Sequence, residues 1–404
     1  MVQRVLKFLG SEIKGLHQAA YLLGLFAIFS QILGLIRDRL LAHSFGASTS
    51  LDIYYAAFRI PDFIFVAVAS MVSIFVLVPF LVDRIDKSKE RGIDFINNIF
   101  SFFFGLIILA SVVAFFLVPF LSKFLFPGFS TESLETLTNL TRVLLLSPIF
   151  LGLSNLFSSI TQVYKKFFVY SISPLLYNLG IIFGILFLYP SLGLMGLGLG
   201  VALGALMHLA IQIPVIIQTG FFPSFKFNLD LKEVIDIVKV SLPRTITLSL
   251  SNITILILIS FASVLGEGSI SVFNFSFNLQ SVPLSIIGVS YSVAAFPTLA
   301  RFFSAGEAKK FTDHIVTASR HIIFWSIPAI FLFVVLRAQI VRVVLGSGRF
   351  GWDDTRLTAA ALALFVVSIL AQALVILFVR GYYAAGITRR PLIINMVSSI
   401  LIVA

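Results

Sequence analysis

The sequence contains no cysteine and few histidines, and only 12% of its 404 residues are charged. Without cysteine the chain has no disulfides, no thiolate metal sites and no cysteine nucleophile. Its five histidines argue against a histidine-rich metal centre. Ordinary soluble domains contain about 25% charged residues. The scarcity of charge therefore argues against a soluble globular protein.

Apolar residues make up 59% of the chain and include 44 phenylalanines. Several apolar runs exceed the roughly 20 residues that cross a bilayer as a helix. We therefore predict an all-α polytopic membrane protein with about eleven membrane helices, the last one incomplete. The predicted spans are residues 19–45, 52–82, 95–121, 137–163, 168–189, 192–218, 240–264, 271–300, 319–336, 357–379 and 391 to the end.

The first eighteen residues precede the first span and carry charges without an apolar core. Their apolar residues recur at steps of three and four, which is typical of one face of a helix. We predict that residues 1–18 form an amphipathic helix lying on the membrane surface. The apolar positions are Val2, Leu6, Leu9, Ile13 and Leu16.

The distribution of lysine and arginine orients the chain. With the N-terminus in the cytoplasm, the loops facing inward hold 20 of the 29 basic residues. An excess of basic residues in cytoplasmic loops is the usual rule for membrane proteins. The net charge of +11 is then explained by topology and by contact with anionic lipids. We therefore predict a cytoplasmic N-terminus, membrane lipids as partners and no nucleic acid.

The sequence also contains an internal repeat. The segment Pro174–Asn178 resembles Pro391–Asn395, and each follows a basic, tyrosine-containing loop. Pro79 and Pro297 close the second and eighth predicted spans at nearly the same separation, about 217 residues. The separation covers six helices, so the copies share one orientation, as in transporters built from parallel repeats. We predict two helical lobes around a central cavity, at residues 19–220 and 221–404.

Arg37 and Asp38 lie inside the first predicted span. A charge at the centre of a membrane helix costs roughly 2.5–3.5 kcal/mol on insertion scales and usually faces protein, water or a polar substrate. Arg37 either lines a polar cavity or extends to the outer interface. Gln31 lies seven residues before Asp38 on the same helical face. It either contacts cargo or hydrogen-bonds a neighbouring helix.

The eighth predicted span is too polar to face lipid, because it contains Asn278 and Gln280 beside Pro283. We predict that these two side chains line a cavity. Asn178 and the equivalent Asn395 are interpreted as structural residues that hydrogen-bond between helices. Arg244, near the start of the seventh span, is interpreted as an interfacial anchor. The glycine run 193–204 predicts close helix packing.

The sequence shows no catalytic constellation. It lacks the HExxH, P-loop and GxSxG patterns that position metal, phosphate or a nucleophile. The adjacent pair Asp353–Asp354 lies near Arg349 and Arg356 and is best interpreted as a surface salt-bridge cluster. We therefore predict a transporter that is not an enzyme.

Several motifs in this sequence resemble those of the MurJ/MviN lipid II flippase family, within the multidrug/oligosaccharidyl-lipid/polysaccharide exporter superfamily. The segment LGLIRDRLLAHSFGASTSLDIYYAAFRIPDF at residues 33–63 resembles the family's opening pattern. FPGFS, PLLYN and NLQSVPLSIIGVSYSVAAFPTLAR follow in the family's order across nearly the whole chain. The resemblance implies two six-helix lobes around a cavity, with two further helices usual in the family.

The resemblance also implies site residues. In the family, cavity arginines are thought to hold the lipid diphosphate. Arg37, with Asp38, matches one of these arginines, and Asp52 and Arg59 match the acidic and basic residues of the opening pattern. Gln31, Phe65 and Asn278 stand where characterised members carry arginine, and Ser70 stands where they often carry glutamate.

These matches imply an alternating-access flippase in a bacterial cytoplasmic (inner) membrane. Its expected cargo is an undecaprenyl-diphosphate-linked peptidoglycan precursor, lipid II, and its expected partners include cell-wall synthesis proteins. No cofactor is expected, and coupling to a Na⁺ or H⁺ gradient or to the membrane potential is implied. Because the cavity has fewer arginines than in the family, two alternatives stay open. One is an exporter of another lipid-linked oligosaccharide, a drug or a cation, and the other is a non-transporting scaffold of cell-wall assembly.

Overall fold

The computed structural model describes residues 12, 16–387 and 389–403, and every regular element among them is a helix. The amphipathic helix predicted for residues 1–18 lies almost wholly outside these residues. By internal contacts the chain divides into two compact units. Unit 1 comprises Met1–Leu40 and Ile53–Ser260, and unit 2 comprises Leu41–Asp52 and Phe261–Ala404. The division at residue 220 that the repeat predicts stays a prediction.

Among the described residues, eight helices are long and apolar enough to span a membrane, or nine if the bent pair Trp352–Val367 and Ile369–Ala384 is one span. The predicted count of eleven is therefore not confirmed. The second predicted span is missing from the eight because it is built from short pieces. The eleventh is missing because its helix, α20 (Arg389–Val403), has only 15 residues.

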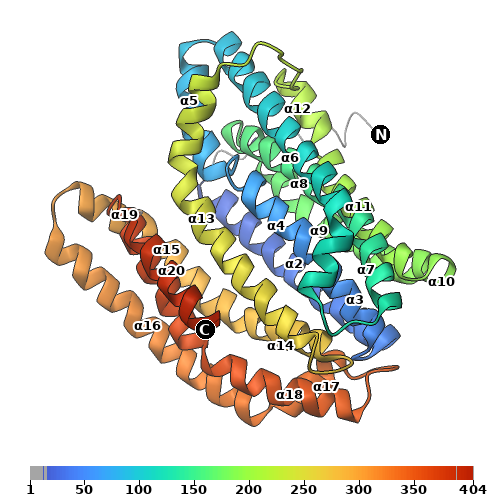
Figure 1. Ribbon diagram of the computed structural model, residues 1–404. Coiled ribbons are helices and arrows are strands. Elements are labelled where there is room, and N and C mark those ends of the chain that lie inside the picture. The colour runs from blue at the N-terminus through green and yellow to red at the C-terminus, as the bar shows by residue number, and fades with distance from the viewer. Residues whose placement is uncertain (1–11, 13–15, 388, 404) are drawn as a thin grey trace. The chain divides into compact units, whose positions relative to one another are not determined.

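Unit 1 contains α2 up to Leu40, the helices α4 to α12, and α13 up to Ser260 (Figure 1). The bounds are α2 Leu16–Phe45, α3 Thr49–Ala57, α4 Arg59–Ile64, η1 Phe65–Ala69, α5 Ile74–Lys87, α6 Lys89–Leu125, α7 Thr131–Leu144, α8 Leu146–Val163, α9 Phe167–Phe183, η2 Gly184–Leu188, α10 Tyr189–Leu192, α11 Leu194–Ala210, α12 Ile213–Thr219 and α13 Leu231–Ala262.

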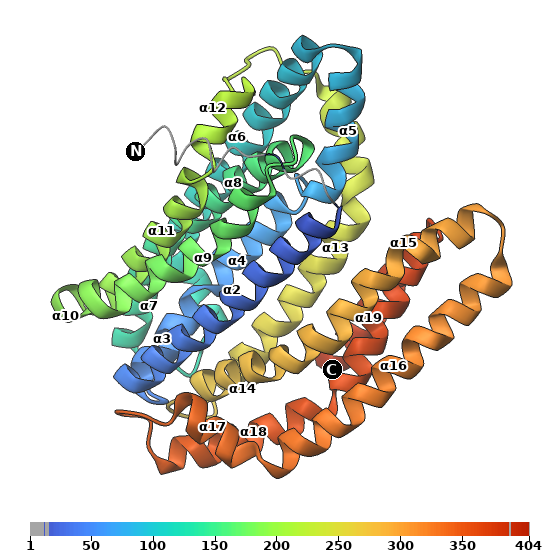
Figure 2. The same cartoon turned by 180° about the vertical axis from the view of Figure 1, so that it is seen from behind.

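Helices α9 and α11 pack unusually closely, and both views show them side by side (Figures 1 and 2). A Cβ built on Gly180 of α9 would lie 2.3 Å from the Cα of Gly204 in α11. One on Gly200 of α11 would lie 2.5 Å from the Cα of Gly184, where η2 continues α9. Only residues without a side chain permit this approach of two backbones. The prediction of close packing for the glycine run is therefore confirmed.

The connection between α12 and α13 is hydrogen-bonded to side chains of α6. Asn97 Oδ1 accepts from Ser224 N at 2.7 Å, and Ser101 Oγ accepts from Lys226 N at 2.7 Å. The buried Asn98 accepts from Asp230 N at 2.9 Å and donates to Asp230 O at 3.0 Å. These side chains follow one face of α6. They explain why α13 belongs to unit 1 although the repeat places it at the start of the second copy.

Unit 2 contains Leu41–Asp52, from the end of α2 to the start of α3, and Phe261–Ala404, which holds the helices after α13. Its core includes Leu299, Ile322 and Leu377, which bring α15, α16 and α19 together (Figure 2). The bounds are α14 Ser269–Leu284, η3 Ser285–Val289, α15 Ser290–Ser304, α16 Ala308–Val335, α17 Arg337–Leu345, α18 Trp352–Val367, α19 Ile369–Ala384 and α20 Arg389–Val403.

The second and eighth predicted spans each contain a one-turn π-helix at equivalent repeat positions. In the first copy, η1 follows Pro61, and in the second, η3 follows Pro283. The copies then differ. The second continues directly into α15, whereas the first is interrupted between Ser70 and Ser73 before α5 begins. The interruption is therefore specific to unit 1.

The close approach of α9 and α11 predicts that Gly200→Ala destabilises the protein. The added methyl group meets backbone, which cannot rotate away, and overpacking of this kind costs about 1–3 kcal/mol. We expect a lower midpoint of thermal unfolding in detergent, measured by fluorescence-detected size exclusion. The control is Gly105→Ala, because nothing lies within 4 Å of a Cβ at Gly105. An equal midpoint for both variants would show that the close approach is not required.

Candidate functional site

The charged pair of α2 lies in unit 1. Arg37 Nε and Nη2 both donate to Asp38 Oδ1, at 3.0 and 2.9 Å. The Asp38 side chain is 5% exposed and that of Arg37 is 24% exposed. Because the carboxylate neutralises the guanidinium, neither charge stands alone within the spanning segment. The guanidinium is also the more accessible partner, so it is the one that an incoming anion can reach.

Asn178 connects the pair to α9. Its Oδ1 accepts from Arg37 Nη1 at 3.2 Å, and its Nδ2 donates to Pro174 O at 3.2 Å and to Ser30 Oγ at 3.4 Å. The prediction that Asn178 hydrogen-bonds between helices is therefore confirmed. Its partner is the arginine of the candidate site, which the sequence did not reveal.

Arg59 belongs to the same group of side chains. Its Nε donates to Tyr55 O at 3.2 Å, and the guanidinium interacts electrostatically with Asp62, one turn further along α4. Tyr177 of α9 interacts electrostatically with both Asp62 and Arg37. The structure thus brings two of the predicted arginines into one neighbourhood. We call this set the unit 1 polar cluster, consisting of Arg37, Asp38, Tyr55, Arg59, Asp62, Tyr177 and Asn178.

A cavity of about 420 Å³ adjoins the unit 1 polar cluster. Asp62 and Ser147 are among its lining residues, together with Pro61 and Phe65. Ser147 also hydrogen-bonds with Tyr177 of the cluster. The cavity therefore combines a carboxylate, a hydroxyl and apolar walls, a mixture that suits a polar group entering from a membrane.

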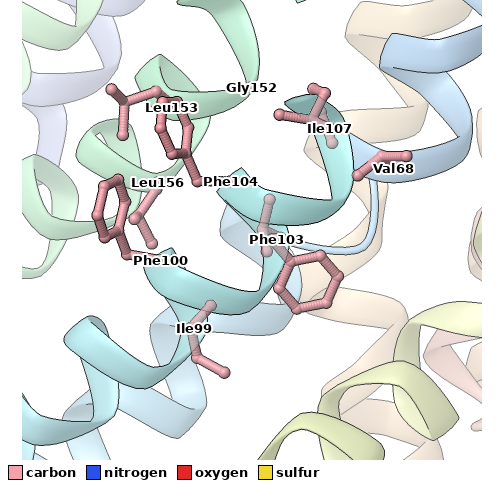
Figure 3. Close-up of a pocket in the computed structure, with 11 residues that line it drawn as sticks. Val68, Ile99, Phe100, Phe103, Phe104, Ile107, Gly152, Leu153 and Leu156 are labelled. Atoms are coloured by element: carbon pink, nitrogen blue, oxygen red, sulfur yellow. The ribbon is translucent and has the colours of Figure 1, made fainter. Parts of the chain in front are cut away.

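A second pocket of unit 1 has a different character (Figure 3). It lies where η1, α6 and α8 meet. Val68, Phe103, Ile107 and Leu156 are typical of its lining, which contains no polar side chain. Burying a polar group there without a hydrogen bond is costly. The pocket is therefore not a candidate for binding a charged headgroup.

Gln31 is half-buried in α2, two turns before Asp38. The side chain of α2 that reaches Asn178 at this level is its neighbour Ser30. Ser30 and Arg37 lie seven residues apart on the face of α2 that contacts α9. A cargo contact for Gln31 stays a prediction.

Asp52 lies in unit 2 and anchors the first turn of α14. It is buried, and its carboxylate accepts from Gly268 N at 2.8 Å, from Ser271 N at 2.7 Å and from Ser271 Oγ at 2.6 Å. A carboxylate at a helix N-terminus satisfies amides that have no partner within the helix. This geometry gives Asp52 an anchoring role, and its predicted contact with cargo stays a prediction.

The polar residues of α14 also lie in unit 2. Gln280 is buried, and its Nε2 donates to Ser368 Oγ at 3.3 Å, at the junction of α18 and α19. Asn278 is half-buried, and its backbone carbonyl accepts from Ser281 Oγ at 2.7 Å. Gln280 thus joins helices within unit 2, whereas Asn278 is more accessible. Their predicted role in lining a cavity stays a prediction.

Three members of the unit 1 polar cluster were not singled out from the sequence: Tyr55, Asp62 and Tyr177. Asp62 lies within the FRIPDF motif and Tyr177 within PLLYN, so both were visible as family motifs. In the part of the chain that the structure describes, no group of three or more histidine, aspartate or glutamate side chains is placed to hold a metal ion.

Comparison with known proteins identifies the family. A family model described as lipid II flippase MurJ matches residues 41–404. A probable lipid II flippase MurJ of Borreliella burgdorferi is 26% identical over 383 residues, covering 93% of this chain and 74% of the relative. One of Haemophilus influenzae is 28% identical over 396 residues, covering 92% of this chain and 77% of the relative.

Solved structures agree with this assignment. The structure of lipid II flippase MurJ in an inward closed conformation has a TM-score of 0.81 and 25% sequence identity, and the match covers 94% of this chain and 79% of that one. An inward-facing multidrug resistance MATE family transporter of the MOP superfamily has a TM-score of 0.75 at 16% identity, covering 92% and 84%. The second similarity concerns the fold alone. The matched residues, the motifs and the fold together place this chain in the lipid II flippase MurJ family.

Proposed function

We propose that this protein moves lipid II from the inner to the outer leaflet of the membrane by alternating access, without making or breaking a covalent bond. Membership of the MurJ family supports the cargo. The observation that carries the proposal is the unit 1 polar cluster, in which Arg37 is held inside a spanning helix by Asp38 and Asn178.

The chemical problem of flipping is the diphosphate. Moving this anion through hydrocarbon is costly unless cations and hydrogen-bond donors replace its water. Arginine suits the task, because its planar guanidinium stays charged and donates two parallel hydrogen bonds to phosphate. Arg37 and Arg59 supply two such groups within unit 1, and Tyr55 and Tyr177 lie within electrostatic range of them.

We propose that Arg37 exchanges partners during transport. In the structure two of its nitrogens donate to Asp38. When the diphosphate arrives, the guanidinium turns to the phosphate oxygens while Asp38 stays close behind it. The return of Arg37 to Asp38 then favours release of the cargo. Asn178, fixed to α9 through Pro174, keeps the guanidinium oriented during the exchange.

The location follows from the proposed function and the pattern of basic residues. We propose that the protein is a multi-pass component of a bacterial cytoplasmic membrane with its N-terminus in the cytoplasm, as the positive-inside rule favours. Its partners would be the lipid-linked cargo, membrane lipids and proteins of cell-wall synthesis. No nucleic acid is involved. Coupling to a Na⁺ or H⁺ gradient or to the membrane potential is proposed as the energy source.

A second candidate function is export of another lipid-linked oligosaccharide or a drug by the same fold. What favours it is the resemblance to the family, which implies arginine at three positions where this chain has Gln31, Phe65 and Asn278. The unit 1 polar cluster also balances its two arginines with Asp38 and Asp62, so it is not strongly cationic.

The first test is complementation of a bacterium depleted of its own lipid II flippase. We expect the full-length gene to restore growth and normal shape, with membrane insertion confirmed by an antibody against a terminal tag. Failure of an inserted protein to restore growth would contradict lipid II as cargo and favour the second candidate.

Arg37→Gln combined with Asp38→Asn should lose transport while keeping the fold. The double variant removes both charges, and so avoids leaving a buried carboxylate unpaired, which costs about 3–5 kcal/mol. Hydrogen bonds to charged groups contribute about 1.5–3 kcal/mol each. We therefore expect flipping of lipid II in proteoliposomes to fall tenfold or more. Transport at the wild-type rate would exclude a cargo contact by Arg37. Arg142→Gln is the control, because the Arg142 guanidinium contacts Phe115 of α6 and lies outside the unit 1 polar cluster.

The proposed orientation can be tested by single-cysteine labelling, because the chain has no native cysteine. Lys310 and Asp353 both have exposed side chains, at 63% and 86%. With the N-terminus inside, Lys310→Cys should react with an impermeant maleimide only after the inner face is exposed. Asp353→Cys should react in intact spheroplasts. The opposite pattern at both positions would invert the topology.

A further inference from the structure

The interruption of the second span lies within its uncharged run. The apolar segment of this span runs between Asp62 and Asp83, and Ser70–Ser73 falls in its middle. At 1.5 Å per residue, Ser73 lies on the order of 15 Å from either end. Non-helical backbone at this depth is tolerated where protein covers it or where it lines water. Ser70 and Ser73 are both half-buried, so the interruption is partly accessible.

Two residues of α13 contact this interruption, and all the groups involved belong to unit 1. Arg244 Nη1 donates to Ser73 Oγ at 2.8 Å. Thr245 Oγ1 and Ser70 Oγ lie 2.9 Å apart, and Ser70 Oγ also donates to Val66 O at 2.5 Å. The structure therefore gathers one guanidinium and three hydroxyl groups around the break.

The interfacial anchor that the sequence suggested for Arg244 stays a prediction. Helix α13 begins at Leu231, so Arg244 lies thirteen residues inside it, directly before the uncharged stretch of residues 245–262. The guanidinium reaches Ser73, which places the charge beside the break in the second span. An ionisable side chain that faces another membrane segment is by default a candidate functional residue.

We propose that Arg244 and Ser73 form a phosphate-binding subsite at the break in the second span. Arg244 would turn from the Ser73 hydroxyl to the oxygens of a phosphate, and the released hydroxyl would donate a second hydrogen bond. Thr245 and Ser70 are positioning residues that keep α13 against the break. The ligand chemistry is a phosphate ester or diphosphate carried by a lipid.

The position of the subsite suggests when it would bind the cargo during transport. This suggestion rests on the proposed function. With the N-terminus inside, the unit 1 polar cluster lies in the outer half of the membrane and Ser73 lies nearer the inner leaflet. A diphosphate entering from the inner leaflet would meet Arg244 before Arg37. Several weak sites along a path allow an ion to enter and also to leave, as in channels. The subsite also adds a third arginine to a unit whose polar cluster balances two arginines with two aspartates.

The experiment compares Arg244→Gln, Arg244→Lys and Ser73→Ala with the control Arg142→Gln. Binding of lipid II and, separately, of phosphatidylglycerol to the detergent-purified full-length protein is measured by native mass spectrometry. Flipping of lipid II is measured in proteoliposomes. We expect Arg244→Gln to weaken lipid II binding tenfold or more, the range of hydrogen bonds to charged groups. Arg244→Lys should restore part of it, and Ser73→Ala should cause a smaller loss.

The two binding measurements distinguish phosphate carried by lipid II from phosphate carried by a membrane phospholipid. Loss of lipid II binding in Arg244→Gln supports a subsite for cargo. Loss of phosphatidylglycerol binding alone supports a phosphate subsite that a membrane phospholipid occupies. If Arg244→Gln and Ser73→Ala reduce flipping equally while binding of both lipids is unchanged, the contact is a clamp between helices and the proposal is overturned. Unchanged binding and flipping in Arg244→Gln would overturn it as well.

The outcome is independent of whether lipid II is the cargo. If the wild-type protein neither binds nor flips lipid II, the proposed function fails, and the phosphatidylglycerol arm still tests the subsite. If the wild-type protein flips lipid II and Arg244→Gln does the same, the proposed function stands and the subsite is rejected.

Discussion

Hydrocarbon offers no hydrogen-bond partner, so each charge and each interruption of a helix within the membrane must be satisfied by the protein itself. The structure meets this requirement with side chains from other segments of the same unit. Asp52 satisfies the first amides of α14, and Asn178 accepts from the guanidinium of Arg37. The break in the second span is met by Arg244 and Thr245. Polar contacts of this kind decide which helices belong together, because apolar surfaces in lipid have little preference among partners.

These contacts explain why the compact units differ from the sequence repeats. In the predicted repeat, helix α13 is the counterpart of α2, yet it belongs to unit 1 up to Ser260. Hydrogen bonds between α6 and the segment that precedes α13 hold it there. The contact of Arg244 with the break does the same. Conversely, Leu41–Asp52 comes from the first repeat and belongs to unit 2, where Asp52 anchors α14. Each repeat therefore contributes a segment to the other unit, and the chain passes between units after Leu40, Asp52 and Ser260.

Much of the fold and part of the candidate site were predictable from the sequence. Hydropathy predicted the long helices, and the cost of an intramembrane charge singled out Arg37 and Asp38. Hydropathy could not reveal the break at Ser70–Ser73, because the surrounding run is continuously apolar and a short π-helix leaves no periodic signal. It also began the seventh span at residue 240, nine residues after α13 begins, because the first turns of α13 are polar and resemble a loop. Contacts between distant segments, such as Asn178 with Arg37, depend on the tertiary fold and are not encoded in local spacing.

A transport site must release what it binds, and this requirement bears on the small number of arginines. An arginine without a counter-charge would hold a diphosphate tightly and slow its departure. Here Asp38 adjoins Arg37, and Asp62 interacts with Arg59, so each cation has a carboxylate to which it can return. Binding then exchanges one anionic partner for another at little net cost, and a ligand shifts such an equilibrium only by its differential affinity. Paired arginines are therefore suited to passing an anion onward, and the neutral balance of the unit 1 polar cluster is compatible with moving a diphosphate.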